Sequence, residues 1–117
     1  MEINQPRLLA SSSLDGIIRL WDLQERLPKS DLIEDKVDNK GIKGLEYNEE
    51  YGGNLLSFGF ENYLNVWCPE ISLTRAYIGR LEGHSSIVVA CKFITDSPNL
   101  VTIDDKTNIR VWDIRIL

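Results

Sequence analysis

The sequence predicts an all-β fold made of one repeated sheet, and three observations support this prediction. Trp21, Trp67 and Trp112 are spaced 46 and 45 residues apart, a period typical of repeated structural units. Each Trp ends a short run in which apolar residues alternate with other side chains, which is the periodicity of a β-strand. Each run follows a polar turn and a second apolar run, and this pairing predicts a hairpin.

The three segments agree position by position when they are aligned on the Trp. An aliphatic residue stands three positions before each Trp and another stands one position before it, and a hydroxyl-bearing residue stands ten positions before it: Ser11, Ser57 and Thr102. Bulky side chains on both faces of the strand indicate that it is covered on both sides. A buried indole needs an acceptor for its N–H. We therefore expect these hydroxyls to accept the indole hydrogen bonds, and all three Trp to be largely buried.

The first part of the chain predicts an incomplete sheet. Its expected strands are 8–13 and 17–22. The Leu14-Asp15-Gly16 turn joins the first two strands as a hairpin. We expect the strand before them to be missing or reduced to Glu2-Ile3-Asn4, which leaves half a sheet in residues 1–23.

The rest of the chain predicts two four-stranded sheets. The strands expected in residues 24–68 are a weak outer strand around 31–33, then 42–48, 54–60 and 63–68. Those expected in residues 69–117 are 74–81, 87–93, 100–104 and 108–114. Each outer strand is expected to come first in its repeat and to belong to the sheet of that repeat. The chain is thus expected to form one domain of two and a half sheets.

The segment from Arg80 to Asp113 indicates which family these repeats resemble. It begins with Gly83-His84 and ends with Trp112-Asp113, and a Gly-His start with a Trp-Asp end is the signature of WD repeats. The chain therefore resembles the WD-repeat family, whose repeats form the blades of β-propellers. Propellers typically close with about 4–8 blades. The resemblance thus implies a partial propeller that needs further blades from a longer chain or an assembly.

The resemblance also implies a hydrogen-bonded set inside the third blade. In the family this set contains Trp, Ser or Thr, His and Asp, and the matching residues here are Trp112, Thr102, His84 and a carboxylate from Asp104-Asp105. Gapless alignment puts Lys106 at the position of Asp15. We select Asp105 for the set, which requires a turn that is one residue longer.

The other blades carry only part of such a set. The corresponding blade anchors are Trp21, Trp67, Ser11, Ser57 and Asp15. The second repeat has Asn39 at the position of His84. Its hydrogen-bonded set is therefore expected to be broken.

Composition and charge argue against several classes of function. The 117 residues have 43% hydrophobic content and a net charge of −5, which fits a globular domain and argues against nucleic acid or an anionic membrane as the main partner. No apolar run reaches the roughly 18 residues of a membrane span. The start of the chain lacks the features of a signal peptide. We therefore expect a cytoplasmic protein in which Cys68 and Cys91 are reduced.

No catalytic, cofactor or metal site is predicted. His84 is the single histidine and has no recognisable nucleophile motif nearby, so a structural role is favoured. Residues 35–46 have an acid at each end, but Lys40 stands where a calcium loop needs Gly. For Asp104-Asp105, capping of a turn is favoured over acid–base chemistry. We expect neither enzymatic activity nor a cofactor.

The resemblance implies a scaffold that binds other proteins through its loops. The candidate contact residues are Lys40, Asn62, Ser85 and Lys106. Residues 44–115, including the run Ser97-Pro98-Asn99-Leu100, are similar to repeats of the large WD-repeat proteins of motile cilia, which implies a place in the cilium or cytoskeleton. The alternative is a regulatory or substrate-receptor subunit of an enzyme complex such as a ubiquitin ligase.

A partial propeller should leave the faces of its end blades uncovered. We expect unusual exposure on the first hairpin, at Leu9 or Ile18, and on the third blade, at Ile109 or Val111. Exposed apolar faces mark an interface or a risk of aggregation. Residues 1–117 alone are therefore expected to be marginally stable.

Overall fold

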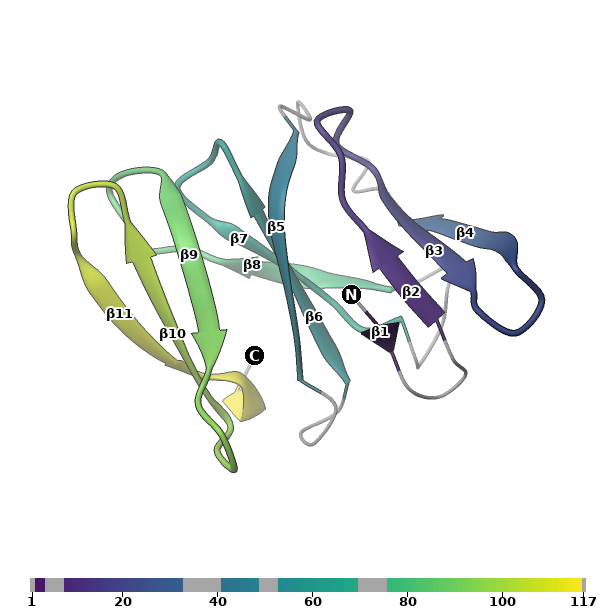
Figure 1. Cartoon of the computed structure of the whole chain (residues 1–117). Coiled ribbons are helices and arrows are strands. Elements are labelled where there is room, and N and C mark those ends of the chain that lie inside the picture. The colour runs from purple at the N-terminus through teal and green to yellow at the C-terminus, as the bar shows by residue number, and fades with distance from the viewer. Residues whose placement is uncertain (1, 4–7, 33–40, 49–52, 70–75, 117) are drawn as a thin grey trace.

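The computed structural model describes residues 2–3, 8–32, 41–48, 53–69 and 76–116. Its strands form three antiparallel sheets that stand side by side along the chain (Figure 1). A short 3-10 helix, η1 (Ile114–Ile116), follows the last strand. Among the described helices, none is long and apolar enough to cross a membrane. The predicted all-β class, built from repeated antiparallel sheets, is confirmed.

Each sheet follows the order of the chain. The first sheet consists of β1 (Glu2–Ile3), β2 (Leu8–Ser11), β3 (Ile18–Asp22) and β4 (Leu27–Leu32). The second consists of β5 (Ile42–Asn48), β6 (Asn54–Gly59), β7 (Leu64–Trp67) and β8 (Tyr77–Leu81). The third consists of β9 (Val88–Phe93), β10 (Asn99–Asp104) and β11 (Ile109–Asp113).

The outer strands belong to different sheets from those expected. β4 pairs with β3, and β8 pairs with β7, so each outer strand completes the sheet before it. The assignments of residues 31–33 to the second sheet and of residues 74–81 to the third sheet were therefore wrong. A tight reversal explains the first case, because the Asp22 side chain accepts the amide hydrogens of Gln24 and Glu25 and returns the chain along β3.

The strand numbers change accordingly. β1 pairs with β2, so the first sheet has four strands, the second has four and the third has three among the described residues. The boundaries 1–23, 24–68 and 69–117 divide the sequence into repeats, and as such they remain a prediction. They do not coincide with the sheets, because each outer strand pairs with the sheet before it.

Two apolar clusters lie between neighbouring sheets. The first joins the first and second sheets and includes Leu8, Ile18, Leu20, Leu55 and Trp67. The second joins the second and third sheets and includes Leu56, Leu64, Val66, Val88 and Leu100. Adjacent residues of β6, Leu55 and Leu56, enter different clusters because successive strand residues point to opposite faces. The second sheet is therefore covered on both faces, as its sequence predicts.

Backbone hydrogen bonds also connect the sheets. The amide of Ile42, at the start of β5, donates to the carbonyl of Ser13 at 2.9 Å, and the amide of Val88, at the start of β9, donates to the carbonyl of Glu61 at 3.0 Å. Both acceptors lie in the hairpin turn of the preceding sheet. The same contact thus positions the second sheet on the first and the third sheet on the second.

The outer face of the third sheet is open. Val89, Ile109 and Val111 are apolar, and their exposed fractions are 49%, 65% and 63%. On the first sheet, Leu9 is 37% exposed but Ile18 is fully buried. Of these two alternatives, Leu9 marks the open face, because Ile18 lies on the face of β3 that packs against the second sheet.

Candidate functional site

A chain of hydrogen bonds runs through the third sheet. The indole Nε1 of Trp112 donates to Thr102 Oγ1 at 2.8 Å. Thr102 Oγ1 lies 2.6 Å from His84 Nε2, and His84 Nδ1 lies 2.9 Å from Asp104 Oδ2. When Nδ1 carries the imidazole proton, every donor in this series meets an acceptor. The set joins β11, β10 and the loop before β9.

The carboxylate of this set is Asp104, and the choice of Asp105 was wrong. Thr102 and Asp104 are two residues apart on β10 and therefore lie on the same face of the strand. Asp105 is exposed and instead accepts a hydrogen bond from the Ser86 hydroxyl. Strand periodicity was the sequence signal that could have identified Asp104.

The turn after β10 keeps Asp104 ionised. Asp104 Oδ1 accepts the amide hydrogens of Lys106 at 2.9 Å and Asn108 at 3.0 Å. Burial raises the pKa of this carboxyl, but hydrogen bonds from Asn108, His84 and Lys106 outweigh burial and lower the pKa from 3.8 to about 2. Among the described residues, every buried side-chain nitrogen or oxygen has a partner. The polar groups of the set are thus satisfied by one another.

The other two sheets have shorter sets. Trp21 Nε1 donates to Ser11 Oγ at 3.0 Å, and Trp67 Nε1 donates to Ser57 Oγ at 2.9 Å. Neither hydroxyl contacts a described histidine, because His84 is the only one in the chain. Asn39, the residue at the equivalent position of the second repeat, lies outside the described residues. In each sheet the Trp indole therefore donates to a hydroxyl. Among the described residues, this hydrogen-bonded set extends to a histidine and an aspartate only in the third sheet.

The three Trp are buried to different degrees, and none is exposed. Trp67 is 3% exposed, and its ring meets the ring of Tyr77 edge-on with 5.1 Å between centroids. Trp21 and Trp112 are half-buried. Trp21 is opposite the partly exposed Leu9 on the uncovered face of the first sheet. No described strand lies beyond β11 in the way that β8 lies beyond β7.

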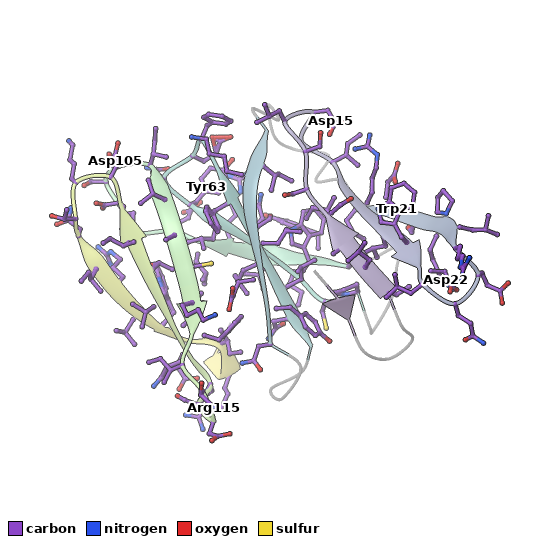
Figure 2. The ribbon with its side chains drawn as sticks, in the orientation of Figure 1. Asp15, Trp21, Asp22, Tyr63, Asp105 and Arg115 are labelled. Atoms are coloured by element: carbon purple, nitrogen blue, oxygen red, sulfur yellow. The ribbon has the colours of Figure 1, made fainter. Side chains whose placement is uncertain are left out.

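Asp15 anchors a turn and does not join an indole set. Its Oδ2 lies 2.6 Å from Arg19 Nη2. Hydrogen bonds from Arg19, and then from the amide of Ile17, lower the pKa of Asp15 from 3.8 to about 2. Figure 2 shows Asp15 at the tip of the first hairpin, apart from Trp21. The ion pair is exposed, so solvent screens it strongly.

The loops at one end of the sheets contain the candidate contact residues. Figure 2 shows Asp15, Tyr63 and Asp105 at this end and Arg115 at the other. Asn62, Ser85 and Lys106 are exposed there, whereas Lys40 lies outside the described residues. Within the part of the chain that the structure describes, no three His, Cys, Asp or Glu side chains are close enough to hold a metal ion.

Sequence reasoning missed a cavity at this end of the third sheet. Its volume is about 510 Å³, and it is lined by Gly83, His84, Ser85, Asp104, Asn108, Ile109 and Arg110. These residues come from the loop before β9 and from the turn and strand that follow β10. The cavity is formed by segments that are distant in sequence, so no local pattern indicates it.

Comparison with known proteins identifies relatives of this architecture. The family model "WD domain, G-beta repeat" matches residues 4–22 and 75–113. Cilia- and flagella-associated protein 337 B of Tetrahymena thermophila is 36% identical over 115 residues, which are 97% of this chain and 9% of that protein. E3 ubiquitin-protein ligase COP1 of Arabidopsis thaliana is 31% identical over 113 residues, which cover 88% of this chain and 16% of the ligase.

A solved structure shows the same fold. The crystal structure of the RRP9 WD40 repeats superimposes with a TM-score of 0.73 at 22% sequence identity. The match covers 93% of this chain and 31% of that one. The chain therefore corresponds to part of a propeller, and it spans only a small part of the length of the relatives it matches.

Proposed function

The chain belongs to the WD40 repeat family, and from this premise we propose that it is a non-enzymatic scaffold that binds other proteins in motile cilia. The observation that carries the proposal is the 36% identity to a cilia- and flagella-associated protein over 97% of this chain. Because the chain covers 9% of that relative, the proposal concerns what this group of blades contributes to a larger protein or assembly.

The burial pattern supports a native form with more blades. The open face of the third sheet carries Val89, Ile109 and Val111, and apolar surface of this kind marks an interface. In the second sheet, the equivalent face is covered by a neighbour. Further blades, supplied by a longer chain or an assembly, would cover the third sheet in the same way.

The expected partners are proteins. A net charge of −5 disfavours nucleic acid and anionic membranes. The histidine and the buried carboxylate, the side chains best suited to proton transfer, are held in the hydrogen-bonded set of the third sheet. This arrangement supports a structural role, with exposed loops available for binding.

Purification from ciliated cells tests the proposal. The protein is tagged at its own locus, cilia are isolated and the membrane is removed with detergent. We expect the protein to stay with the insoluble axoneme and to co-purify with tubulin and dynein-associated proteins. Recovery in the cell body alone, without axonemal proteins, would contradict the proposal.

A second candidate function is that of a substrate-receptor or regulatory subunit of a ubiquitin ligase. The observation in its favour is the 31% identity to E3 ubiquitin-protein ligase COP1. The same purification distinguishes the two, because recovery of ligase subunits in place of axonemal proteins would favour the ligase.

A further inference from the structure

The first and third sheets carry an arginine at the same position, two residues before the Trp, in different surroundings. Arg19 forms an ion pair with Asp15, which stands six residues before Trp21. In the third sheet Lys106 occupies the equivalent of the Asp15 position, so Arg110 has no acid at that place. No described carboxylate forms an ion pair with Arg110. Among the described residues, Arg110 therefore lacks the acidic partner that Arg19 has.

Arg110 borders the cavity of the third sheet, and its guanidinium lies near Trp112 and Gly83. It lies opposite Thr102 in the β10–β11 pair, and its guanidinium carbon is 5.9 Å from the centroid of the Trp112 ring. A Cβ atom at Gly83 would come within 2.8 Å of Arg110 Nη1, and Gly83 has a φ of 152°. Glycine at this position thus leaves the space that the guanidinium occupies.

The other polar groups of the cavity favour a single acceptor. Asp104 directs its oxygens to His84 and to the turn amides, and it forms no ion pair with Arg110. The hydroxyl of Ser85 is exposed and forms no hydrogen bond to a described residue. Exposed Glu82 and Asp105 lie next in sequence to lining residues and would repel a tract of several acids.

We infer that this cavity binds a single carboxylate from a segment of a protein partner, and that Arg110 recognises it. A guanidinium presents two parallel N–H groups that match the two oxygens of a carboxylate. The Ser85 hydroxyl adds a donor at the same rim. The inference rests on the proposed scaffold function and adds the chemistry by which one of its partners is recognised.

Saturation-transfer NMR on the full natural protein tests the inference, because the method detects weak ligands of large proteins. The probe is the capped tripeptide Ac-Ala-Glu-Ala-NH2, and the comparison peptides carry Gln or phosphoserine at the centre. We expect saturable binding of the Glu peptide and binding at least about tenfold weaker for the Gln peptide, a difference of about 1.4 kcal/mol.

Three variants separate Arg110 from a general charge effect. Arg110→Gln should weaken binding of the Glu peptide about tenfold. Lys106→Asp restores an acid at the position of Asp15 and should block the site to a similar degree by pairing with Arg110. Arg115→Gln removes an exposed arginine that pairs with Asp113 and should leave binding unchanged.

Each contrary result is distinguishable. Equal binding by wild type and Arg110→Gln, or no binding of the Glu peptide, would overturn the inference. Preference for the phosphoserine peptide would overturn it in favour of a phosphate site. If the Arg110→Gln protein binds every peptide as the wild type does and still co-purifies with axonemal proteins, the inference fails and the scaffold function stands. If the wild type never joins the axoneme, the proposed function fails independently.

Discussion

The second and third sheets share one strand pattern but hold their tryptophans in different ways. Trp67 is buried between two sheets and meets the Tyr77 ring of the outer strand β8. Trp112 is half-buried, and its hydrogen bond to Thr102 continues to His84 and Asp104. The second sheet therefore relies on apolar cover, and the third relies more on directed hydrogen bonds.

This difference shows what the polar set adds to a blade. Apolar cover orders a side chain without fixing its neighbours in one orientation, because the hydrophobic effect is not directional. The hydrogen-bonded set instead ties the loop that contains His84 to β10 and to the turn after it. That loop forms one wall of the cavity, so the set gives the proposed binding site a rigid boundary.

The largest expected effect is that of removing Trp67. Trp67→Ala should lower the free energy of unfolding by about 4–5 kcal/mol, because it opens a cavity between two sheets. Trp112→Ala should cost about 3 kcal/mol, because part of its ring already contacts solvent. Urea denaturation of both variants measures the difference. A larger loss for Trp112→Ala would contradict the comparison.

In the same experiment, removal of the hydroxyls should affect the two sheets in the opposite order, with a larger loss of stability in the third sheet than in the second. Thr102→Val deprives both His84 and Trp112 of a partner and should cost about 2–4 kcal/mol. Ser57→Ala deprives only the Trp67 indole and should cost about 1–2 kcal/mol. Thr102→Ser keeps the hydroxyl and serves as the control. Equal losses for Thr102→Val and Ser57→Ala would show that His84 adds nothing to the set.

Acid denaturation should separate a buried carboxylate from an exposed one. The pKa values of Asp104 and Asp15 are both lowered from 3.8 to about 2 in the folded protein. Since a lowered pKa stabilises the fold above the unfolded value, this stability is lost as the pH falls from about 4 to about 2. Asp104→Asn and Asp15→Asn should each weaken the dependence on pH over that range.

Salt provides the control for this prediction. At about 1 M NaCl the exposed Asp15–Arg19 pair is screened, so Asp15→Asn should approach the wild-type pH dependence. Asp104→Asn should keep its difference from the wild type, because its hydrogen bonds are buried. The measurement is the urea midpoint as a function of pH at low and high salt, and identical salt responses would refute the distinction.

The smallest effect is expected in the hairpin turns. Gly16 and Thr107 stand five residues before Trp21 and Trp112, and their φ angles are 84° and 64°. A β-branched residue at such a φ is strained by about 1–2 kcal/mol, part of which is offset by the higher unfolded-state entropy of Gly. Thr107→Gly should therefore stabilise the protein by about 0.5 kcal/mol, and Gly16→Thr should destabilise it by about 1 kcal/mol, measured by thermal unfolding.

Much of the fold could be predicted because its signals are local. The alternation before each Trp and the hydroxyl ten residues earlier correspond to neighbouring strands of one sheet. The sheet to which each outer strand belongs was not predictable in this way. β4 has the sequence LPKSDL, and only its last residue is buried, so it lacks the alternation that would indicate a partner.

The candidate site was less predictable than the fold, because it depends on contacts between segments that are distant in sequence. Strand periodicity could have identified Asp104 in place of Asp105, but the pairing of Asp104 with His84 joins residues 20 apart. The half-burial of Trp112 depends on which strands lie nearby. Lys106 in place of an acid was visible in the alignment. The position of Arg110 at a cavity was not, because it depends on the approach of Gly83 from another loop.

The amide hydrogens of Ile42 and Val88 provide a separate record of how the sheets come apart. Each is donated to a carbonyl of the preceding sheet, whereas ladder amides are donated within one sheet. Deuterium therefore enters Ile42 and Val88 when two sheets undock, and enters the ladders only when a sheet itself melts. In an array whose units contact only their neighbours, these two hydrogen bonds connect consecutive blades. The exchange times of the two amides therefore report how often neighbouring blades separate while each blade remains folded.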